Sequence, residues 1–331
     1  MNKKTIQSIS NTLNSDYTQD KNRFQNIYSK ECFKEDLLSE KVDNAIIMAA
    51  GMSSRFAPIS YEIPKGLIKV KGEILIERQI KQLKEAGIEE IIIVVGYKKE
   101  MFYYLKEKFG VVIVENPEFN TRNNHSSLYY ARGYLKNSYI CSADNYFTTN
   151  VFNKYEFDSF YSSVFIDGDT DEWCLYFDED DLIKDVKIGG VCEWIMLGHA
   201  YFTREFSNTF IDILVNNYHK EDITSLLWES LYTKNLDKLK MYIKKFSNAD
   251  IFEFDTLDEL RAFDSSYKND TNSAIIKHVT KILECIENDI TECKPIYSKG
   301  DVIGFSFLKD KRLYSYMYDG DKLEEEKQNY E

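Results

Sequence analysis

The sequence predicts an α/β fold in which helices cover both faces of a mostly parallel sheet. From residue 44 onward, apolar runs of strand length alternate with amphipathic helical segments. Repeated strand–helix–strand units with short connections build parallel sheets. Gly87 and Gly110 are the last residues of two of the helical segments, where glycine commonly ends a helix. The run over 88–97 is apolar without alternation, as expected of a strand that is covered on both faces.

The expected elements follow one another regularly as far as residue 144. We predict strands over 45–48, 88–97, 111–117 and 138–144, and helices over 74–87, 98–110 and 126–136. In the first helix Ile76, Ile80 and Leu83 have the spacing of one buried face. Residues 1–43 are polar and contain no Gly or Pro, so we expect an N-terminal extension without catalytic residues.

After residue 160 the pattern changes to a series of strands and then helices. Strand-like segments lie at 162–168, 173–180, 182–188, 199–203, 238–246 and 250–255, and helix-like segments at 206–218, 223–235 and 257–263. We place the main domain at 44–270. Residues 273–289 have the pattern of another amphipathic helix, and the residues after them alternate like a small β-meander. We therefore predict that 271–331 form a small α+β appendage.

The composition excludes several classes of protein. The chain has 331 residues, with 42 Lys+Arg, 55 Asp+Glu and a formal charge of −13, so we do not expect it to bind nucleic acid. An apolar fraction of 43% fills a sizeable core and excludes general disorder. No apolar run exceeds six residues, so we expect neither a membrane-spanning helix nor a secretory signal. Scattered cysteines without a C-x-x-C pair then indicate reduced thiols in a cytoplasmic protein.

Small residues follow the first predicted strand and form what we call the phosphate loop. Its residues are Ala49, Ala50, Gly51, Met52, Ser53 and Ser54. Backbone N–H groups of such a turn can hold phosphate oxygens. Arg55 follows directly, and Lys65 stands in a Pro-Lys-Gly sequence, so two cations are available for a triphosphate. Small residues after a strand are also consistent with tight packing alone, and the loop is neither a GxGxxG nor a Walker A motif.

The sequence A-A-G-M-S-S-R followed by P-K-G-L resembles the signature of the nucleotidyltransferase-A superfamily, L-A-A-G-x-G-[ST]-R…P-K. The resemblance implies a Rossmann-like sheet and displacement at the α-phosphate of a nucleoside triphosphate. It also implies that Arg55 and Lys65 are catalytic residues that stabilise charge on the triphosphate. This sequence departs from the signature at its second glycine, where Ser53 stands.

Residues 115–131 are similar to the N-x-x-Y…N-N-x-x-S-L stretch of the phosphocholine cytidylyltransferase group. This similarity implies that polar residues before the helix face the pyrimidine and ribose, which makes Asn124 and Ser127 nucleotide-binding candidates. The alternative is an ordinary helix cap, with Asn123 or Asn124 capping a helix that begins near Ser126. Both interpretations can hold at once.

Two aspartates are the last residues of predicted strands, Asp144 of 138–144 and Asp255 of 250–255. The carboxyl edge of an open α/β sheet is where ligands bind. The resemblance implies that one carboxylate from each segment holds a Mg²⁺ ion that bridges the reacting phosphates. Carboxylate oxygens suit this ion, which keeps several waters and binds nucleotide phosphates. We therefore predict Mg²⁺ as the cofactor.

For the acceptor, the resemblance implies aromatic faces and carboxylates around a trimethylammonium group, which cannot donate hydrogen bonds and prefers aromatic ring faces. Trp173 stands next to Glu172, and Trp228 stands next to Glu229. Tyr201 is a further aromatic candidate. The helical pattern around Trp228 is also consistent with a core position.

We therefore expect transfer of CMP from CTP to phosphocholine, by in-line attack on the α-phosphate, giving CDP-choline and pyrophosphate. Alternatives are transfer to 2-aminoethylphosphonate, phosphoethanolamine or a sugar 1-phosphate, and a regulatory module that binds CTP without turnover. Association into a homo-oligomer is left open. Residues 273–318 resemble the opening of a bacterial choline kinase N-lobe, but the H-G-D catalytic loop is absent. We therefore expect a truncated remnant without kinase activity, which packs on the main domain or mediates association.

Overall fold

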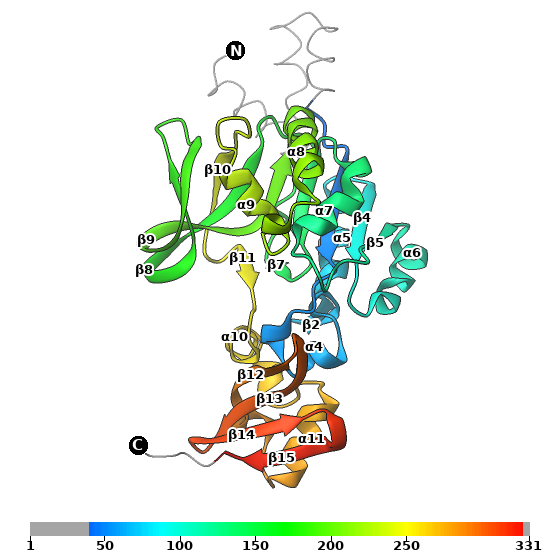
Figure 1. The fold of residues 1–331 in the computed structure, drawn as a ribbon, viewed down its shortest axis with the longest axis vertical. Helices are drawn as coiled ribbons and strands as arrows, with labels where there is room; N and C mark the ends of the chain where they lie inside the picture. Colours follow the sequence, from blue (N-terminus) through cyan, green and yellow to red (C-terminus); the bar gives the residue numbers. More distant parts are fainter. Residues whose placement is uncertain (1–39, 327–331) are drawn as a thin grey trace, which may run out of the picture.

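A seven-stranded mixed sheet lies at the centre of the molecule, in the order β10-β8-β9-β6-β1-β4-β5 (Figure 1). The structure is a computed structural model that describes residues 40–326. The strands are β1 (Asn44–Ala49), β4 (Glu90–Val95), β5 (Val112–Glu115), β6 (Ser138–Ser142), β8 (Phe160–Phe177), β9 (Ile183–Phe202) and β10 (Tyr242–Phe246). β1, β4, β5 and β6 are parallel, β9 is antiparallel to β6 and β8, and β10 is parallel to β8. The prediction of a mostly parallel sheet is confirmed.

Helices cover both faces of this sheet, as predicted. One face carries α5 (Leu75–Glu85) and α6 (Tyr104–Phe109), and the other carries α7 (His125–Ala131), α8 (Arg204–Asn217) and α9 (Trp228–Thr233). Side chains of β1 alternate between the two cores, because Ala45 and Ile47 pack on the α5 side and Ile46 packs on the α7 side. Burial on both sides explains why these strands are apolar without alternation.

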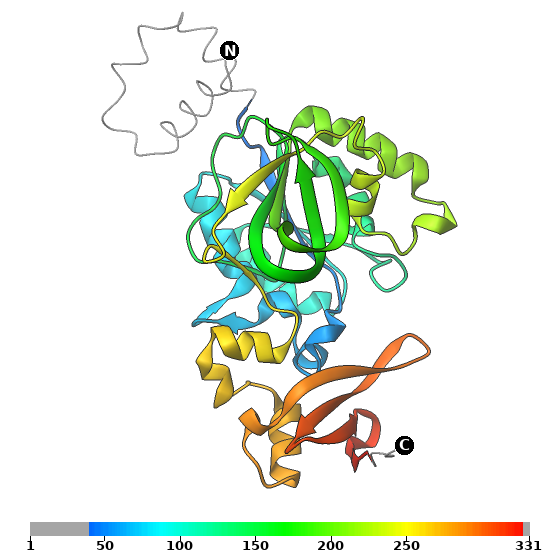
Figure 2. The same cartoon turned by 90° about the vertical axis from the view of Figure 1, so that its left-hand side faces the viewer.

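The separate strands predicted between 162 and 203 are wrong, because the structure has two long strands there, β8 and β9. They pair as one bent hairpin in which Val164 faces Ile195 and Trp173 faces Ile188. Gly168 and Gly198 have φ values of 119° and 102°, so glycine bends the strands where the sequence suggests ends. Figure 2 shows the hairpin curling over itself.

Several predicted helices are shorter than expected. The helix predicted over 223–235 is reduced to α9, preceded by the 3₁₀ turn η5 (Glu221–Ile223). The one over 98–110 is divided into η3 (Lys99–Phe102) and α6, and the one over 126–136 into α7 and η4 (Arg132–Tyr134). Helix boundaries are thus less well predicted than the order of the elements.

Short elements connect the sheet to the C-terminal part. After β1 come η1 (Ser54–Phe56), α4 (Ile59–Glu62), η2 (Lys65–Leu67) and the strand pair β2 (Lys69–Val70) and β3 (Glu73–Ile74). Beyond β6, β7 (Asn145–Phe147) pairs in antiparallel fashion with β11 (Ile251–Glu253). This pairing brings the segments that end in Asp144 and Asp255 together.

The predicted β-meander is present at the C-terminus and comprises β12 (Thr291–Ser298), β13 (Asp301–Lys309), β14 (Arg312–Met317), η8 (Asp319–Asp321) and β15 (Lys322–Glu325). It follows α10 (Leu257–Phe263), η6 (Ser265–Lys268), α11 (Ala274–Ile282) and η7 (Glu287–Asp289). Phe305, Phe307 and Tyr316 share a core with Phe56 and Ile59. The appendage, at the lower end of Figure 1, therefore packs directly on the segment that follows the phosphate loop.

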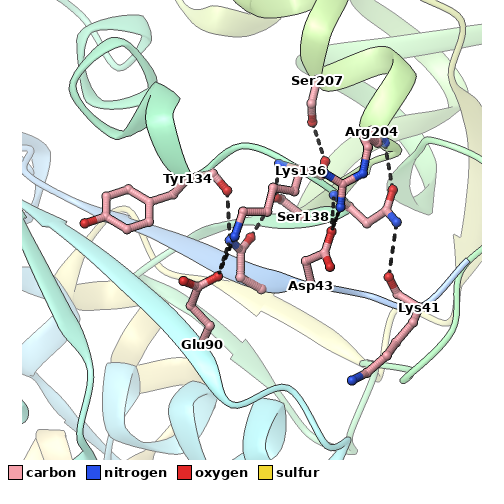
Figure 3. Close-up of polar contacts among 10 residues, drawn as sticks. Lys41, Asp43, Glu90, Tyr134, Lys136, Ser138, Arg204 and Ser207 are labelled. Carbon is pink, nitrogen blue, oxygen red and sulfur yellow. Dashed lines mark hydrogen bonds and ion pairs between the residues drawn. The ribbon is translucent and has the colours of Figure 1, made fainter. Parts of the chain in front are cut away.

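Polar contacts close the edge of the sheet at which the parallel strands begin (Figure 3). Arg204 pairs with Asp43, and Lys136 pairs with Glu90 at 3.3 Å. Fully buried Asn44 donates to Glu90 at 2.9 Å and accepts from the hydroxyl of Ser138 at 2.7 Å. These contacts join the amino ends of β1, β4 and β6 to one another. The phosphate loop lies at the opposite edge of the sheet, after the carboxyl end of β1.

None of the helices within residues 40–326 is long and apolar enough to cross a membrane. The five cysteines of this part of the chain are free, and Cys141, Cys174 and Cys293 are buried. The predicted N-terminal extension falls almost entirely within residues 1–39, which lie outside the described residues.

Candidate active site

The phosphate loop leaves the carboxyl end of β1 with its backbone N–H groups available. Within residues 40–326, the N–H groups of Gly51, Met52 and Ser53 donate to no protein acceptor. A Cβ atom added to Gly51 would meet no atom within 4 Å, so packing does not require glycine there. Open space and free donors are what a bound phosphate group needs. The geometry therefore favours the ligand interpretation of these small residues over tight packing alone.

Lys65 joins two of the predicted residues. Its Nζ atom lies 2.9 Å from Oδ2 of Asp144 and 3.2 Å from Oδ1 of Asp255, and its side chain is only 5% exposed. The glycine of the Pro-Lys-Gly sequence is required sterically, because a Cβ atom on Gly66 would lie 2.8 Å from the Cβ atom of Ala143. Glycine thus allows the lysine segment to approach the end of β6 closely.

Arg55 completes the group of four predicted charges. Its Nη1 atom lies 2.9 Å from Oδ2 of Asp255, and its side chain is 71% exposed. The structure therefore brings together Arg55, Lys65, Asp144 and Asp255, which come from four distant segments. Arg55 lies on the open side of the group and Lys65 on the buried side, so the two cations approach a ligand from different directions.

A third carboxyl group, Glu253, belongs to this group and was not predicted. Its Oε1 atom lies 4.0 Å from Nζ of Lys65. The charge of Asp144 and burial together raise the pKa of Glu253 to about 8. Burial alone would lower the pKa of Lys65, but the charges of Asp144, Glu253 and Asp255 outweigh it and raise that pKa. Glu253 reaches this group because β11 pairs with β7, a long-range contact that no local sequence pattern indicates.

The donor set fits a magnesium ion. Oδ1 of Asp144 is buried and has no hydrogen-bond partner among the described residues. Within those residues no group of three or more His, Cys, Asp or Glu side chains is arranged to hold a metal ion. Mg²⁺ normally binds through one or two carboxylates, with waters and substrate phosphates as its other ligands. Asp144 and Asp255, beside the phosphate loop, match that requirement.

A cavity of about 220 Å³ opens between the phosphate loop and α7. The predicted residues that line it are Ala49, Ala50, Gly51, Ser53, Lys65, Asn124, Ser127 and Asp144. Met52 and Ser54 line a neighbouring cavity instead. The phosphate loop, Lys65 and Asp144 in its lining make this cavity the candidate nucleotide site.

Other lining residues were not predicted, although they lie within the quoted 115–131 stretch. Buried Asn116 donates to the hydroxyls of Ser126 and Ser127, at 2.8 and 3.2 Å. Arg122 pairs with Glu118 at 3.1 Å and lies over the ring of Tyr218. These contacts fix the side chains that form this wall of the cavity. In the sequence, the polar character of these residues was the feature that could have identified them.

Asn124 joins α7 to α9. It occupies the N-cap position of α7, but its side chain makes no hydrogen bond that caps this helix. Instead its Oδ1 atom accepts from the backbone N–H of Trp228 at 2.7 Å, and its amide donates to Glu229 at 3.2 Å. The Asn124 side chain therefore caps α9 rather than its own helix. Burial raises the pKa of Glu229 to about 7.

Two of the acceptor candidates do not reach the cavity. Trp228 is 1% exposed and stacks on Tyr161. Tyr201 is fully buried and pairs with Tyr139 near the start of β6, whereas the cavity lies beyond the end of that strand. Both are core residues in this structure, because the packing of β9 on β6 and of α9 on the sheet covers them.

Of the other two acceptor candidates, Glu172 lies near the charged group. Glu172 lies on β8, and desolvation of its carboxyl group together with the negative charge of Asp255 raises its pKa. The charge of Arg55 acts on Glu172 in the opposite sense. Trp173 is the next residue and is half-buried. The bent hairpin of β8 and β9 therefore brings the carboxylate of Glu172 close to the Arg55–Asp255 pair, whereas the ring of Trp173 packs against the core on the α7 side of the sheet.

Known proteins resemble both the sequence and the fold. A family model described as the MobA-like NTP transferase domain matches residues 45–154. Choline-phosphate cytidylyltransferase from Streptococcus pneumoniae is 35% identical over 226 residues, which cover 68% of this chain and 99% of that protein. A 2-aminoethylphosphonate cytidylyltransferase from Lancefieldella rimae is 37% identical over 230 residues, which cover 68% of this chain and 93% of that protein.

A solved structure of CTP:phosphocholine cytidylyltransferase from Streptococcus pneumoniae superposes with a TM-score of 0.65 at 34% identity. The match covers 67% of this chain and 98% of that chain. The predicted nucleotidyltransferase-A fold is therefore confirmed, and about a third of this chain has no counterpart in these relatives. The chain belongs to the cytidylyltransferases of the nucleotidyltransferase superfamily.

Proposed function

We propose that the protein transfers CMP from CTP to phosphocholine and releases pyrophosphate, with Mg²⁺ as cofactor. The observation that carries the proposal is the meeting of Lys65, Asp144 and Asp255 at a cavity lined by the phosphate loop. Both relatives described above are cytidylyltransferases, one of choline phosphate and the other of 2-aminoethylphosphonate. They support the nucleotide and the class of acceptor.

The reaction needs alignment and charge stabilisation more than proton transfer. A phosphate oxygen of the acceptor attacks the α-phosphorus of CTP and forms the new P–O bond, while the bond to the pyrophosphate oxygen breaks on the opposite side. The attacking phosphate is already ionised near neutral pH, so no general base is required. Lys65 and Arg55 stabilise the negative charge that develops on the leaving pyrophosphate.

Asp144 and Asp255 would hold the magnesium ion, which when bound supplies further positive charge to the reacting phosphates. The Lys65 ammonium contacts both carboxylates and so keeps them side by side before any ligand binds. Such preorganisation reduces the rearrangement that the site must undergo at each turnover.

Trp173 and Glu172 are the residues that we assign to the acceptor. A quaternary ammonium group is attracted to an aromatic face, and the half-buried ring of Trp173, next to Glu172 in the sequence, provides one. A primary ammonium would instead donate hydrogen bonds to carboxylates such as Glu172 and Glu253. The relative from Lancefieldella rimae makes 2-aminoethylphosphonate the second candidate acceptor.

The test is release of pyrophosphate from CTP and MgCl₂ with each of several acceptors. Phosphocholine, phosphoethanolamine, 2-aminoethylphosphonate and glucose 1-phosphate are compared, and a reaction without acceptor is the control. We expect the highest kcat/KM with phosphocholine. A higher value with 2-aminoethylphosphonate would replace phosphocholine by the second candidate. If no acceptor stimulates pyrophosphate release above the control, cytidylyl transfer to this class is wrong.

A further inference from the structure

The C-terminal meander reaches the phosphate loop at one point. The hydroxyl of Tyr297, on β12, donates to Oγ of Ser54 at 2.7 Å. Between the loop and the start of β13 lies a separate cavity of about 160 Å³, lined in part by Met52, Ser54 and Val302. Tyr297 itself is 53% exposed, so burial of its ring does not explain its position. The hydrogen bond to Ser54 is therefore a specific contact at the edge of this second cavity.

The residue before Ser54 has a backbone conformation that favours glycine. Ser53 has φ 49° and ψ 47°, in the left-handed region, where a Cβ atom crowds the following carbonyl group. Ser53 is also the position at which the sequence departs from the superfamily signature, which has glycine there. Glycine enters this region without such crowding, whereas serine needs support from its surroundings.

The meander is attached firmly enough to provide that support. Buried Arg261 donates to the carbonyl oxygens of Ile290 and Glu287, which precede β12. The carboxylate of Glu62 accepts from the first N–H of α11, that of Ala274, at 2.7 Å. Together with the shared core of Phe56 and Phe305, these contacts fix the meander to the elements that follow the loop.

We infer that Tyr297 is a positioning residue for nucleotide binding, which holds the phosphate loop in its left-handed turn through Ser54. The meander thereby provides by an external hydrogen bond what glycine at position 53 would provide by conformational freedom. Arg55 directly follows Ser54, so the same contact also limits the movement of the guanidinium that pairs with Asp255. The inference rests on nucleotide binding at this loop and not on the identity of the acceptor.

The test compares Tyr297→Phe with the wild-type protein in CTP binding, measured by calorimetry without acceptor, and in steady-state kinetics. Loss of one hydroxyl contact predicts a Kd and a KM for CTP about three- to tenfold higher. The acceptor KM and the Tm should change little. Tyr314→Phe is the matched control, because that hydroxyl lies 3.5 Å from Glu325 within the meander. It should leave the Kd for CTP unchanged.

Repeating the Tyr297→Phe substitution in two other variants distinguishes the inferred role of its hydroxyl from a general effect of the meander on CTP binding. In Ser54→Ala, Tyr297→Phe should change the Kd for CTP less than twofold, because the acceptor of its hydrogen bond is already gone. In Ser53→Gly the change should also fall below twofold, because glycine adopts the left-handed turn unaided. The inference is wrong if Tyr297→Phe alone changes the Kd less than twofold, or if its effect persists in either background. Since no acceptor is present in the binding assay, an error in the proposed acceptor leaves these results unaffected.

Discussion

Nζ of Lys65 lies 2.9 Å from Oδ2 of Asp144, although 79 positions separate the two residues in the sequence. The same ammonium contacts Asp255, and Glu253 lies 4.0 Å away. One buried lysine thus faces three carboxyl groups, of which Asp144 has an oxygen without a partner among the described residues. The first two predictions below follow from this arrangement.

Replacement of Lys65 by alanine should reduce kcat for pyrophosphate release by about 100-fold or more, by analogy with the loss of one oxyanion donor. The ammonium both stabilises the leaving group and keeps Asp144 and Asp255 together. Stopped assays of pyrophosphate under saturating CTP measure the change, and a thermal melt checks that the variant is folded. A folded Lys65→Ala enzyme with near-normal turnover would exclude Lys65 from the mechanism.

Asp144→Asn should weaken metal binding, because an amide oxygen carries no charge to attract Mg²⁺. We expect the Mg²⁺ concentration for half-maximal activity to rise at least about tenfold. Binding of Mn²⁺, followed by electron paramagnetic resonance in the presence of CTP, gives a readout that does not depend on turnover. Asp212→Asn, on the exposed surface of α8, is the matched control. Equal Mn²⁺ affinity in the two variants would contradict the assignment of Asp144.

The four charged residues were predictable because each follows a local signal. Arg55 and Lys65 stand in a short motif, and Asp144 and Asp255 follow apolar strand segments. Glu253 was missed because its role depends on the pairing of β11 with β7, which the sequence does not reveal. Local patterns thus identify residues at strand ends, whereas neighbours that arise from long-range pairing need the structure.

Burial was less predictable than position along the chain. Tyr201 is covered through its pairing with Tyr139 of β6 and Phe160 of β8, which lie 62 and 41 positions earlier in the sequence. Trp228 is covered by Phe202 and Phe210 from other elements. An aromatic residue beside a carboxylate therefore has the same sequence appearance in a ligand site and in a core. The sequence also predicts several short strands in place of the hairpin of β8 and β9. Gly168 and Gly198 suggest strand ends, but in the structure they only bend the strands.

Glu229 should make the stability of the protein depend on pH. Burial raises its pKa from 4.5 to about 7, so the folded state binds the proton more tightly than the unfolded state does. The free energy of unfolding from this group is therefore greatest below pH 4.5 and decreases as the pH rises through about 7. Glu229→Gln removes this contribution, and we expect its stability relative to wild type to increase by about 2 kcal/mol between pH 5 and 7.5.

Urea denaturation at several pH values measures this difference. Comparison with wild type at each pH is needed because other carboxyl groups, Glu253 among them, also titrate in this range. Glu205→Gln, an exposed residue at the start of α8, is the control and should follow the wild-type pH dependence. If Glu229→Gln follows it as well, the buried carboxyl group does not titrate near neutral pH.

Trp173→Ala should affect mainly binding and Trp228→Ala mainly stability, because the ring of Trp173 is half-buried on the hairpin of β8 and β9 and that of Trp228 is 1% exposed in the core. Loss of Trp173 removes the aromatic face proposed for the acceptor, so the KM for phosphocholine should rise about tenfold or more while the KM for CTP changes little. Loss of Trp228 leaves a large cavity and should lower the free energy of unfolding by about 3–5 kcal/mol.

Steady-state kinetics with each substrate varied in turn, together with urea denaturation of both variants, test this pair of expectations. The same kinetic series with 2-aminoethylphosphonate separates the two acceptors, because a primary ammonium relies on carboxylates and should respond less to the loss of Trp173. If Trp173→Ala leaves the KM for phosphocholine unchanged, the hairpin of β8 and β9 does not provide the acceptor site. A stable Trp228→Ala variant with a raised acceptor KM would instead return Trp228 to that site.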